Sequence, residues 1–186
     1  RAGSWTSGAF PLAHALRGKT AGIVGLGRIG KAIAYRLTAH GLTIAYFGRQ
    51  QQVVAYDYCD SLCGLAKKAD FLIVACPGGS GTKHLINAKV LSALGSDGIL
   101  INIARGSVVD EVALIAALKT GEIRGAGLDV FENEPQVPAE LIDSEKVVIL
   151  PHVGSATHET RQAMAQLVRD NLAAHFANQP LVTPVC

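Results

Sequence analysis

The chain has 186 residues, of which 49% are hydrophobic and 17% are charged. It can therefore bury a large core, and disorder is not expected. Its formal net charge of +2 gives no support for a nucleic-acid partner or a membrane partner recognised through bulk charge. The four cysteines lack a second Cys/His pair at zinc spacing, so we predict no metal site, reduced thiols and a cytoplasmic location. The chain starts at Arg1, and we expect it to be a fragment of a longer protein.

Taken in order, residues 1–19 show no sustained hydrophobic period and are expected to form a connecting arm. Strands are predicted where short apolar runs occur, over residues 20–24, 43–47, 71–75, 99–103, 126–130 and 147–150. Helices are predicted between and after them, over residues 31–40, 61–68, 87–94, 110–118 and 157–177. This alternation predicts an α/β fold with a doubly wound parallel sheet of six strands. The sheet and its helices would form a three-layer α/β/α Rossmann domain over residues 20–186.

A glycine motif stands at the junction of the first predicted strand and helix. Gly25, Gly27 and Gly30 have the spacing G-x-G-x-x-G. In that context the first glycine permits a tight turn, the second lets the backbone approach a pyrophosphate, and the third lets helix and strand pack closely. The amides of Gly27, Arg28 and Ile29 would then point at a phosphate. We predict a dinucleotide site here; the alternative is a glycine-rich turn that binds nothing.

The end of the second predicted strand bears on the choice of cofactor. An acidic residue there would bind the ribose 2′-hydroxyl of NAD and repel the 2′-phosphate of NADP. This chain has Gly48 followed by Arg49 and Gln50, and its next carboxylate, Asp57, comes too late. Because the guanidinium of Arg49 can bind the 2′-phosphate of NADP, we predict that NADP is preferred over NAD. The alternative is that Arg49 is a solvated loop residue.

Three later segments, residues 102–106, 127–135 and 151–157, each follow a predicted strand. The carboxyl ends of the strands form the ligand edge of a doubly wound sheet. Arg105, Glu134 and His152 could therefore converge beside a nicotinamide. Each alone would more often be structural or solvated, but the three together, in this order, favour a catalytic site.

With the glycine motif, these segments resemble the D-isomer-specific 2-hydroxyacid dehydrogenases over most of the chain, from about Trp5 to Pro184. At 48–50 the chain looks most like the glyoxylate/hydroxypyruvate reductases, because phosphoglycerate dehydrogenases usually carry aspartate where Gly48 stands. The resemblance implies reduction of a small 2-oxoacid to the D-2-hydroxyacid by hydride transfer from NAD(P)H. It also implies a homodimer formed through this domain, with the Trp5 arm packed on the partner.

The resemblance also implies roles for individual side chains. Arg105 would bind the substrate carboxylate and polarise the carbonyl. His152 would be the acid/base, and Glu134 would fix its tautomer and keep its proton available near neutral pH. Asp129 would lie at the nicotinamide amide, and Glu132 would lie outside the site.

Further cofactor contacts are expected at the same strand ends. Thr82 is expected either to cap the next helix or to reach the phosphates. The other expected contacts are Cys76 and Pro77 over the adenosine, Ile103 and Ala104 against the nicotinamide, and Gly154 and Ser155 near its carboxamide.

In the family a second domain, built mainly from preceding chain, supplies the other wall of the substrate cleft. That domain is largely absent from this chain, so we expect the chain alone to be inactive. Two alternatives stay open: a catalytically silent protein that senses the dinucleotide on the same scaffold, and a phosphoglycerate-dehydrogenase-type activity.

Overall fold

The computed structural model describes residue 8 and residues 12–184. The chain divides into two compact units, residues 1–149 and residues 150–186. The first unit holds a seven-stranded sheet, and the second holds one long helix. Most of the predicted arm, including Trp5, lies outside the described residues.

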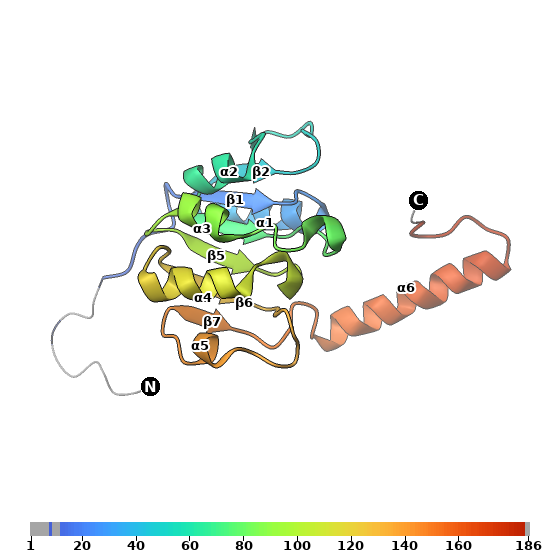
Figure 1. The fold of residues 1–186 in the computed structure, drawn as a ribbon. Coiled ribbons are helices and arrows are strands. Elements are labelled where there is room, and N and C mark those ends of the chain that lie inside the picture. The colour runs from blue at the N-terminus through green and yellow to red at the C-terminus, as the bar shows by residue number, and fades with distance from the viewer. Residues whose placement is uncertain (1–7, 9–11, 185–186) are drawn as a thin grey trace. The chain divides into compact units, whose positions relative to one another are not determined.

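All seven strands run parallel, in the order β3-β2-β1-β4-β5-β6-β7 (Figure 1). The chain enters at β1, winds outward to β3, returns across β1 to β4 and winds outward to β7, so the doubly wound Rossmann prediction is confirmed. The prediction of six strands is wrong by one, because β3 pairs only two residues and is too short to show a period. The strands are β1 (Thr20–Val24), β2 (Thr43–Phe47), β3 (Asp57–Tyr58), β4 (Phe71–Val74), β5 (Ile99–Asn102), β6 (Gly125–Leu128) and β7 (Val147–Ile149).

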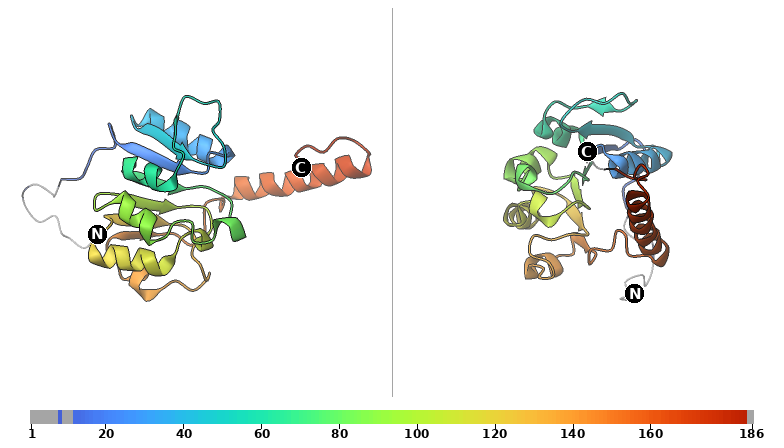
Figure 2. Two further views of the ribbon diagram at one scale, coloured as in Figure 1. Left: turned by 45° about the horizontal axis from the view of Figure 1, so that its top comes forward. Right: turned by 90° about the vertical axis from the view of Figure 1, so that its right-hand side faces the viewer.

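Helices cover both faces of the sheet. Figure 2 shows α1 on one face and α2 to α5 on the other, which makes the three layers. The short elements α5, η1 and η2 were not predicted, since three or four residues cannot display a helical period. The α-helices are α1 (Arg28–Ala39), α2 (Leu62–Lys68), α3 (Ala88–Leu94), α4 (Glu111–Thr120), α5 (Ala139–Ile142) and α6 (His158–Phe176), and the 3₁₀ turns are η1 (Ser80–Thr82) and η2 (Gly106–Val108).

Side-chain caps decide where most helices begin. Ser61, Asn87 and Asp110 were predicted as first residues, and each is instead the N-cap whose side-chain oxygen accepts a backbone N–H of the first turn. Thr157 was predicted as an N-cap and is one. Among the helices that were predicted, the exception is α1, which begins three residues before its predicted start and has Gly27 as an N-cap without a side-chain bond.

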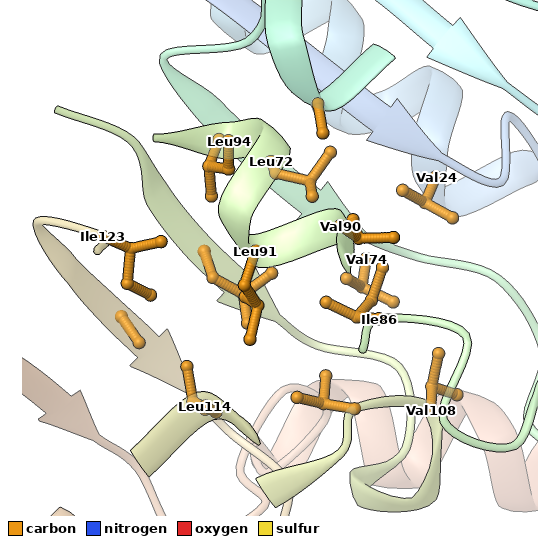
Figure 3. Packing of buried hydrophobic residues seen from close by; sticks show 14 of the residues in the cluster. Val24, Leu72, Val74, Ile86, Val90, Leu91, Leu94, Val108, Leu114 and Ile123 are labelled. Atoms are coloured by element: carbon orange, nitrogen blue, oxygen red, sulfur yellow. The ribbon is translucent and has the colours of Figure 1, made fainter. Parts of the chain in front are cut away.

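The core is mostly aliphatic and lies on both faces of the sheet. In β1, Ala21 and Ile23 pack in the cluster that contains Ala34 of α1, whereas Val24 belongs to the larger cluster with α2, α3 and α4. Figure 3 shows that larger cluster. A Cβ at Gly22 would lie 2.9 Å from the Cβ of Ala69, so the chain just after α2 packs directly on β1. Burial on both faces explains why the strands read as continuous apolar runs.

The second unit contains α6 and the segments around it. Thr157 caps the helix through Thr160 N, as predicted. After the helix, the chain returns to it, because Asn171 Oδ1 accepts the N–H of Thr183 at 3.1 Å. No helix in the described part of the chain is long and apolar enough to cross a membrane.

Candidate cofactor and active site

A pocket of about 840 Å³ lies at the carboxyl ends of β1, β2 and β4. These strands meet where the winding of the sheet reverses, the usual ligand position in doubly wound folds, and the volume suits a cofactor-sized ligand. The pocket is lined by Val24, Gly25, Leu26, Gly27, Phe47, Gly48, Arg49, Gln50, Gln51, Gln52, Cys76, Pro77, Gly78, Gly79, Ser80, Gly81, Thr82 and Leu85.

The three motif glycines differ in what surrounds them. Gly25 has φ +95°, and a Cβ there would lie 2.7 Å from Cys76 Cα. A Cβ at Gly30 would overlap the carbonyl oxygen of Gly25. Gly27 has nothing within 4 Å of an added Cβ, yet it lines the pocket. The fold therefore requires glycine at 25 and 30, whereas at Gly27 it leaves the space in which a ligand can approach the backbone.

The start of α1, at its N-cap Gly27, forms one side of this pocket. Its N-cap makes no side-chain hydrogen bond, and its first turn contains no acidic residue. The first N–H groups of a helix have no partner within the helix, so an uncapped helix start beside a pocket suits a phosphate. Arg28 and Ile29 lie exposed in this first turn, but they do not line the pocket.

The loop after β2 supplies the opposite side of the pocket. Gly48, Arg49 and Gln50 all line it, as the cofactor prediction requires. Among the described residues that line the pocket, Arg49 is the only one with a charged side chain, and none is acidic. The electrostatic environment at this side of the pocket is therefore suited to an anionic group.

Cys76 and Pro77 line the pocket from the end of β4. Burial raises the pKa of the Cys76 thiol, against a smaller opposing effect of a backbone hydrogen bond. A neutral thiol is a small apolar group here rather than a nucleophile. Cys59 and Cys63, like Cys76, form no disulfide, and the described residues contain no group of three or more His, Cys, Asp or Glu that could hold a metal.

Thr82 lines the pocket but does not cap the next helix. Its hydroxyl donates to Pro77 O at 2.8 Å, and the cap of α3 is Asn87. Of the two expectations for Thr82, the capping role is therefore wrong. The hydroxyl instead closes the turn between β4 and η1. This turn, residues 78–81, was missed as pocket lining, although three glycines in four residues are typical of a loop that a ligand can approach.

The loop after β5 carries Ile103, Ala104 and Arg105. Buried Asn102 holds it: its Nδ2 donates to Arg105 O at 3.0 Å, and its Oδ1 accepts the N–H of Ala104 at 3.1 Å. The stem of Arg105 lies against the pocket wall, since a Cβ on Gly78 would be 2.7 Å from Arg105 Cγ. Arg105 itself is exposed, and its Nη1 donates to Ala104 O at 2.6 Å.

The loop after β6 lies against the loop after β5. The N–H of Asp129 donates to Asn102 O at 3.1 Å, and an added Cβ on Gly106 would overlap the backbone of Phe131. The N–H of Phe131 donates to Glu134 Oε1 at 2.9 Å. The fold thus brings the loops that carry Arg105 and Glu134 into backbone contact.

Glu132 takes part in a separate cluster. Its Oε1 lies 2.8 Å from His84 Nε2, and its N–H donates to Glu111 Oε1 at 2.7 Å. Burial raises the pKa of Glu111; the hydrogen bond from Glu132 opposes this effect, and the charge of Glu132 adds to it. The contact with Glu111 fastens the loop after β6 to the start of α4, and the contact with His84 fastens it to the segment after η1.

His152, Gly154 and Ser155 belong to the second unit. Their approach to Arg105, Glu134 and the cofactor pocket stays a prediction. His152 has a positive φ of 53°, a backbone conformation that is uncommon for residues other than glycine and that is often found at functional sites.

The family model for the D-isomer specific 2-hydroxyacid dehydrogenase, NAD binding domain, matches residues 1–154. The chain belongs to this family. Its resemblance to the dehydrogenases, inferred from the motifs, is thereby confirmed. Among curated relatives, this chain is 52% identical over 186 residues to a hydroxyphenylpyruvate reductase of Plectranthus scutellarioides. It is also 52% identical over 186 residues to a glyoxylate/hydroxypyruvate reductase of Arabidopsis thaliana. In both comparisons all of this chain aligns with 59% of the relative.

A solved structure shares the fold of this chain. It is the NADPH-dependent glyoxylate/hydroxypyruvate reductase of Sinorhizobium meliloti in complex with NADP and malonate. The TM-score is 0.92 at 53% sequence identity, and the match covers 99% of this chain and 59% of that one. The chain thus spans 59% of the length of these relatives.

Proposed function

We propose that this chain is the cofactor-binding part of an NAD(P)H-dependent reductase that converts a small 2-oxoacid, such as glyoxylate or hydroxypyruvate, into a D-2-hydroxyacid. We further propose that it prefers NADPH to NADH. The observation that carries this preference is the end of β2: Gly48 stands where an NAD site would carry an acid, and Arg49 is the one charged side chain among the described lining residues. The names of the relatives support the substrate class.

The residues present fit a dinucleotide. Gly27 leaves its space open, the uncapped start of α1 can receive the pyrophosphate, and Arg49 can receive the 2′-phosphate. When bound, the dinucleotide supplies the hydride. We assign the remaining contacts as the resemblance implies, with Asp129, Ile103 and the 154–155 pair toward the nicotinamide.

The protein's own side chains would bind the substrate and move the proton. Arg105 would hold the carboxylate of the 2-oxoacid through two parallel hydrogen bonds and polarise its carbonyl. His152 would donate a proton to the forming alkoxide. Glu134 would fix the tautomer of His152 and favour its protonated form. The exposed position of Arg105 and the hydrogen-bonded loop of Glu134 support these assignments.

We also propose a cytoplasmic homodimer. The three described cysteines without disulfides support a reducing compartment, and the resemblance supports a dimer formed through this domain. Size-exclusion chromatography with light scattering tests the dimer: a mass of about 39 kDa, twice the 19.4 kDa of the chain, is expected, and a monomer at all concentrations contradicts it.

Calorimetric titration of the 186-residue chain with NADPH and NADH tests the cofactor preference. A phosphate–guanidinium contact contributes about 1.5–3 kcal/mol, so we expect NADPH to bind roughly tenfold or more tightly. A side chain fits at position 48, where the nearest atom to an added Cβ is 4.0 Å away. Gly48→Asp should therefore reverse the preference by repelling the 2′-phosphate, while Gly48→Asn, of matched size, should keep it. Equal dissociation constants in the wild-type chain would overturn the preference.

A further inference from the structure

The segment between β2 and β3, residues 48–56, is fastened at its middle. The side chain of Gln52 reaches the glycine loop, where its Nε2 donates to Leu26 O at 2.9 Å. The backbone N–H of Gln52 donates to the hydroxyl of Tyr46 at 2.7 Å. One residue is thus joined both to the loop that follows β1 and to the strand from which its own segment leaves.

Tyr46 is a rigid anchor for this connection. It lies in β2 and is fully buried, and its ring packs against that of Tyr58 in β3 with centroids 5.4 Å apart. Its hydroxyl is the polar end of a core side chain, and Gln52 N–H supplies a hydrogen-bond partner for it.

The two hydrogen bonds close a short arc, residues 48–51, between the end of β2 and Gln52. Every residue of this arc lines the cofactor pocket, and Arg49 is one of them. A second link lies at the base of the arc, where Gly25 N–H donates to Phe47 O at 2.9 Å. The arc is therefore held at both ends against the glycine loop, although Arg49 and Gln50 themselves are exposed.

We propose that Gln52, held by Tyr46, is a positioning residue for cofactor selectivity: it fastens the 48–51 arc so that Arg49 is held ready for the 2′-phosphate of NADPH. This inference rests on the proposed cofactor preference. A loop ordered in advance loses less conformational entropy when a ligand binds. NADH has no 2′-phosphate for Arg49 to bind. Loss of the hydrogen bonds that hold the arc should therefore weaken the binding of NADPH more than that of NADH.

The test measures dissociation constants of NADPH and NADH for the 186-residue chain and two variants. Gln52→Met keeps the length of the side chain but removes its amide, and Tyr46→Phe removes the hydroxyl that receives Gln52 N–H. Each variant is expected to bind NADPH roughly three- to tenfold more weakly. Tyr46 does not line the pocket, so Tyr46→Phe should change NADH binding by less than about twofold, whereas Gln52→Met, at a lining position, should weaken NADPH binding more than NADH binding. Because both variants release the same arc, the double variant should lose less than the product of the single losses.

Tyr56→Phe is the matched control. It removes the same phenolic hydroxyl, at a half-buried tyrosine that packs against the core and whose hydroxyl forms no hydrogen bond with the described residues. Its NADPH-to-NADH ratio should equal that of the wild-type chain. Thermal unfolding verifies that each variant is folded, and if one does not fold, the other still tests the proposal.

The outcomes separate this inference from the proposed function. A wild-type chain without NADPH preference overturns the proposed preference, and this inference with it. A wild-type preference that both variants retain in full overturns only the role of Gln52. Equal weakening of NADPH and NADH also overturns it, because the hydrogen bond to Leu26 would then support the glycine loop for either cofactor.

Discussion

Gly25, Gly27 and Gly30 share one motif but have different physical surroundings. An added Cβ would meet Cys76 at position 25 and the Gly25 carbonyl at position 30, but it would meet no protein atom within 4 Å at position 27. The first and third glycines are therefore needed for folding. The second is needed only if a ligand occupies the space beside it.

This difference predicts two classes of variant. Gly27→Ala should change the free energy of unfolding by less than about 1 kcal/mol, since its φ of −79° is ordinary, but it should weaken NADPH binding by about tenfold or more. Gly30→Ala should lower the free energy of unfolding by about 1–3 kcal/mol or more through overpacking. Thermal unfolding and calorimetry measure the two effects. Unchanged NADPH affinity in Gly27→Ala would show that the pyrophosphate does not lie there.

At the scale of elements, Asp70 joins the amino ends of two central strands. Its carboxylate accepts Lys19 Nζ at 2.7 Å and Thr20 N–H at 2.8 Å, and its own N–H donates to Thr20 O at 2.9 Å. Burial by itself would raise the pKa of Asp70, but the hydrogen bonds from Lys19 and Thr20 and the charge of Lys19 outweigh it and lower the pKa. The start of β1 and the start of β4 are thus held together by an ionised carboxylate.

A lowered pKa means that the folded state favours the charged carboxylate. Its contribution to stability is present above the unfolded pKa of about 3.9 and is lost as the pH falls through the lower folded value. Asp70→Asn should lower the free energy of unfolding at pH 7 by about 1 kcal/mol, a modest value because the pair is partly solvated.

Urea unfolding at pH 7 and near pH 3 measures this prediction. The difference between Asp70→Asn and wild type should shrink as the pH falls below about 4. Asp97→Asn, at an exposed turn position, is the control and should have little effect at either pH. A difference for Asp70→Asn that is independent of pH would show that its charge is not what stabilises the strands.

At the scale of the whole molecule, the chain aligns with 59% of its relatives. We predict that the chain alone binds NADPH but reduces hydroxypyruvate or glyoxylate at a negligible rate. The reason is that positioning of the substrate can contribute about 7–11 kcal/mol to catalysis, and the second wall of the cleft is expected from a domain outside this chain.

The decrease of NADPH absorbance with each 2-oxoacid measures this turnover. A longer chain that includes the second domain is the comparison, and it should be active under the same conditions. Comparable rates for the two proteins would mean that the substrate site is complete within these residues.

Local patterns in the sequence were sufficient for much of the fold. Six strands were predictable because strands buried on both faces are continuous apolar runs. The starts of four helices were predictable to within one residue, because Ser61, Asn87, Asp110 and Thr157 cap amides only two or three positions away. The glycine motif was recognisable because its turn and helix start are also local.

Contacts between distant segments were decided only by the tertiary structure. The two-residue β3 exists because it pairs with β2. Two residues are too few to show a hydrophobic period in the sequence. The side chain of Gln52 donates to the carbonyl of Leu26, 26 positions earlier in the sequence. Gly106, after β5, packs so closely on the backbone of Phe131, after β6, that an added Cβ would overlap it. A side chain's intrinsic preferences act over about one helical turn, whereas these contacts depend on which strands lie side by side. The glycine loop and residues 48–50, which line the pocket, were therefore predictable from the sequence, but the connections that hold these loops in place required the assembled sheet.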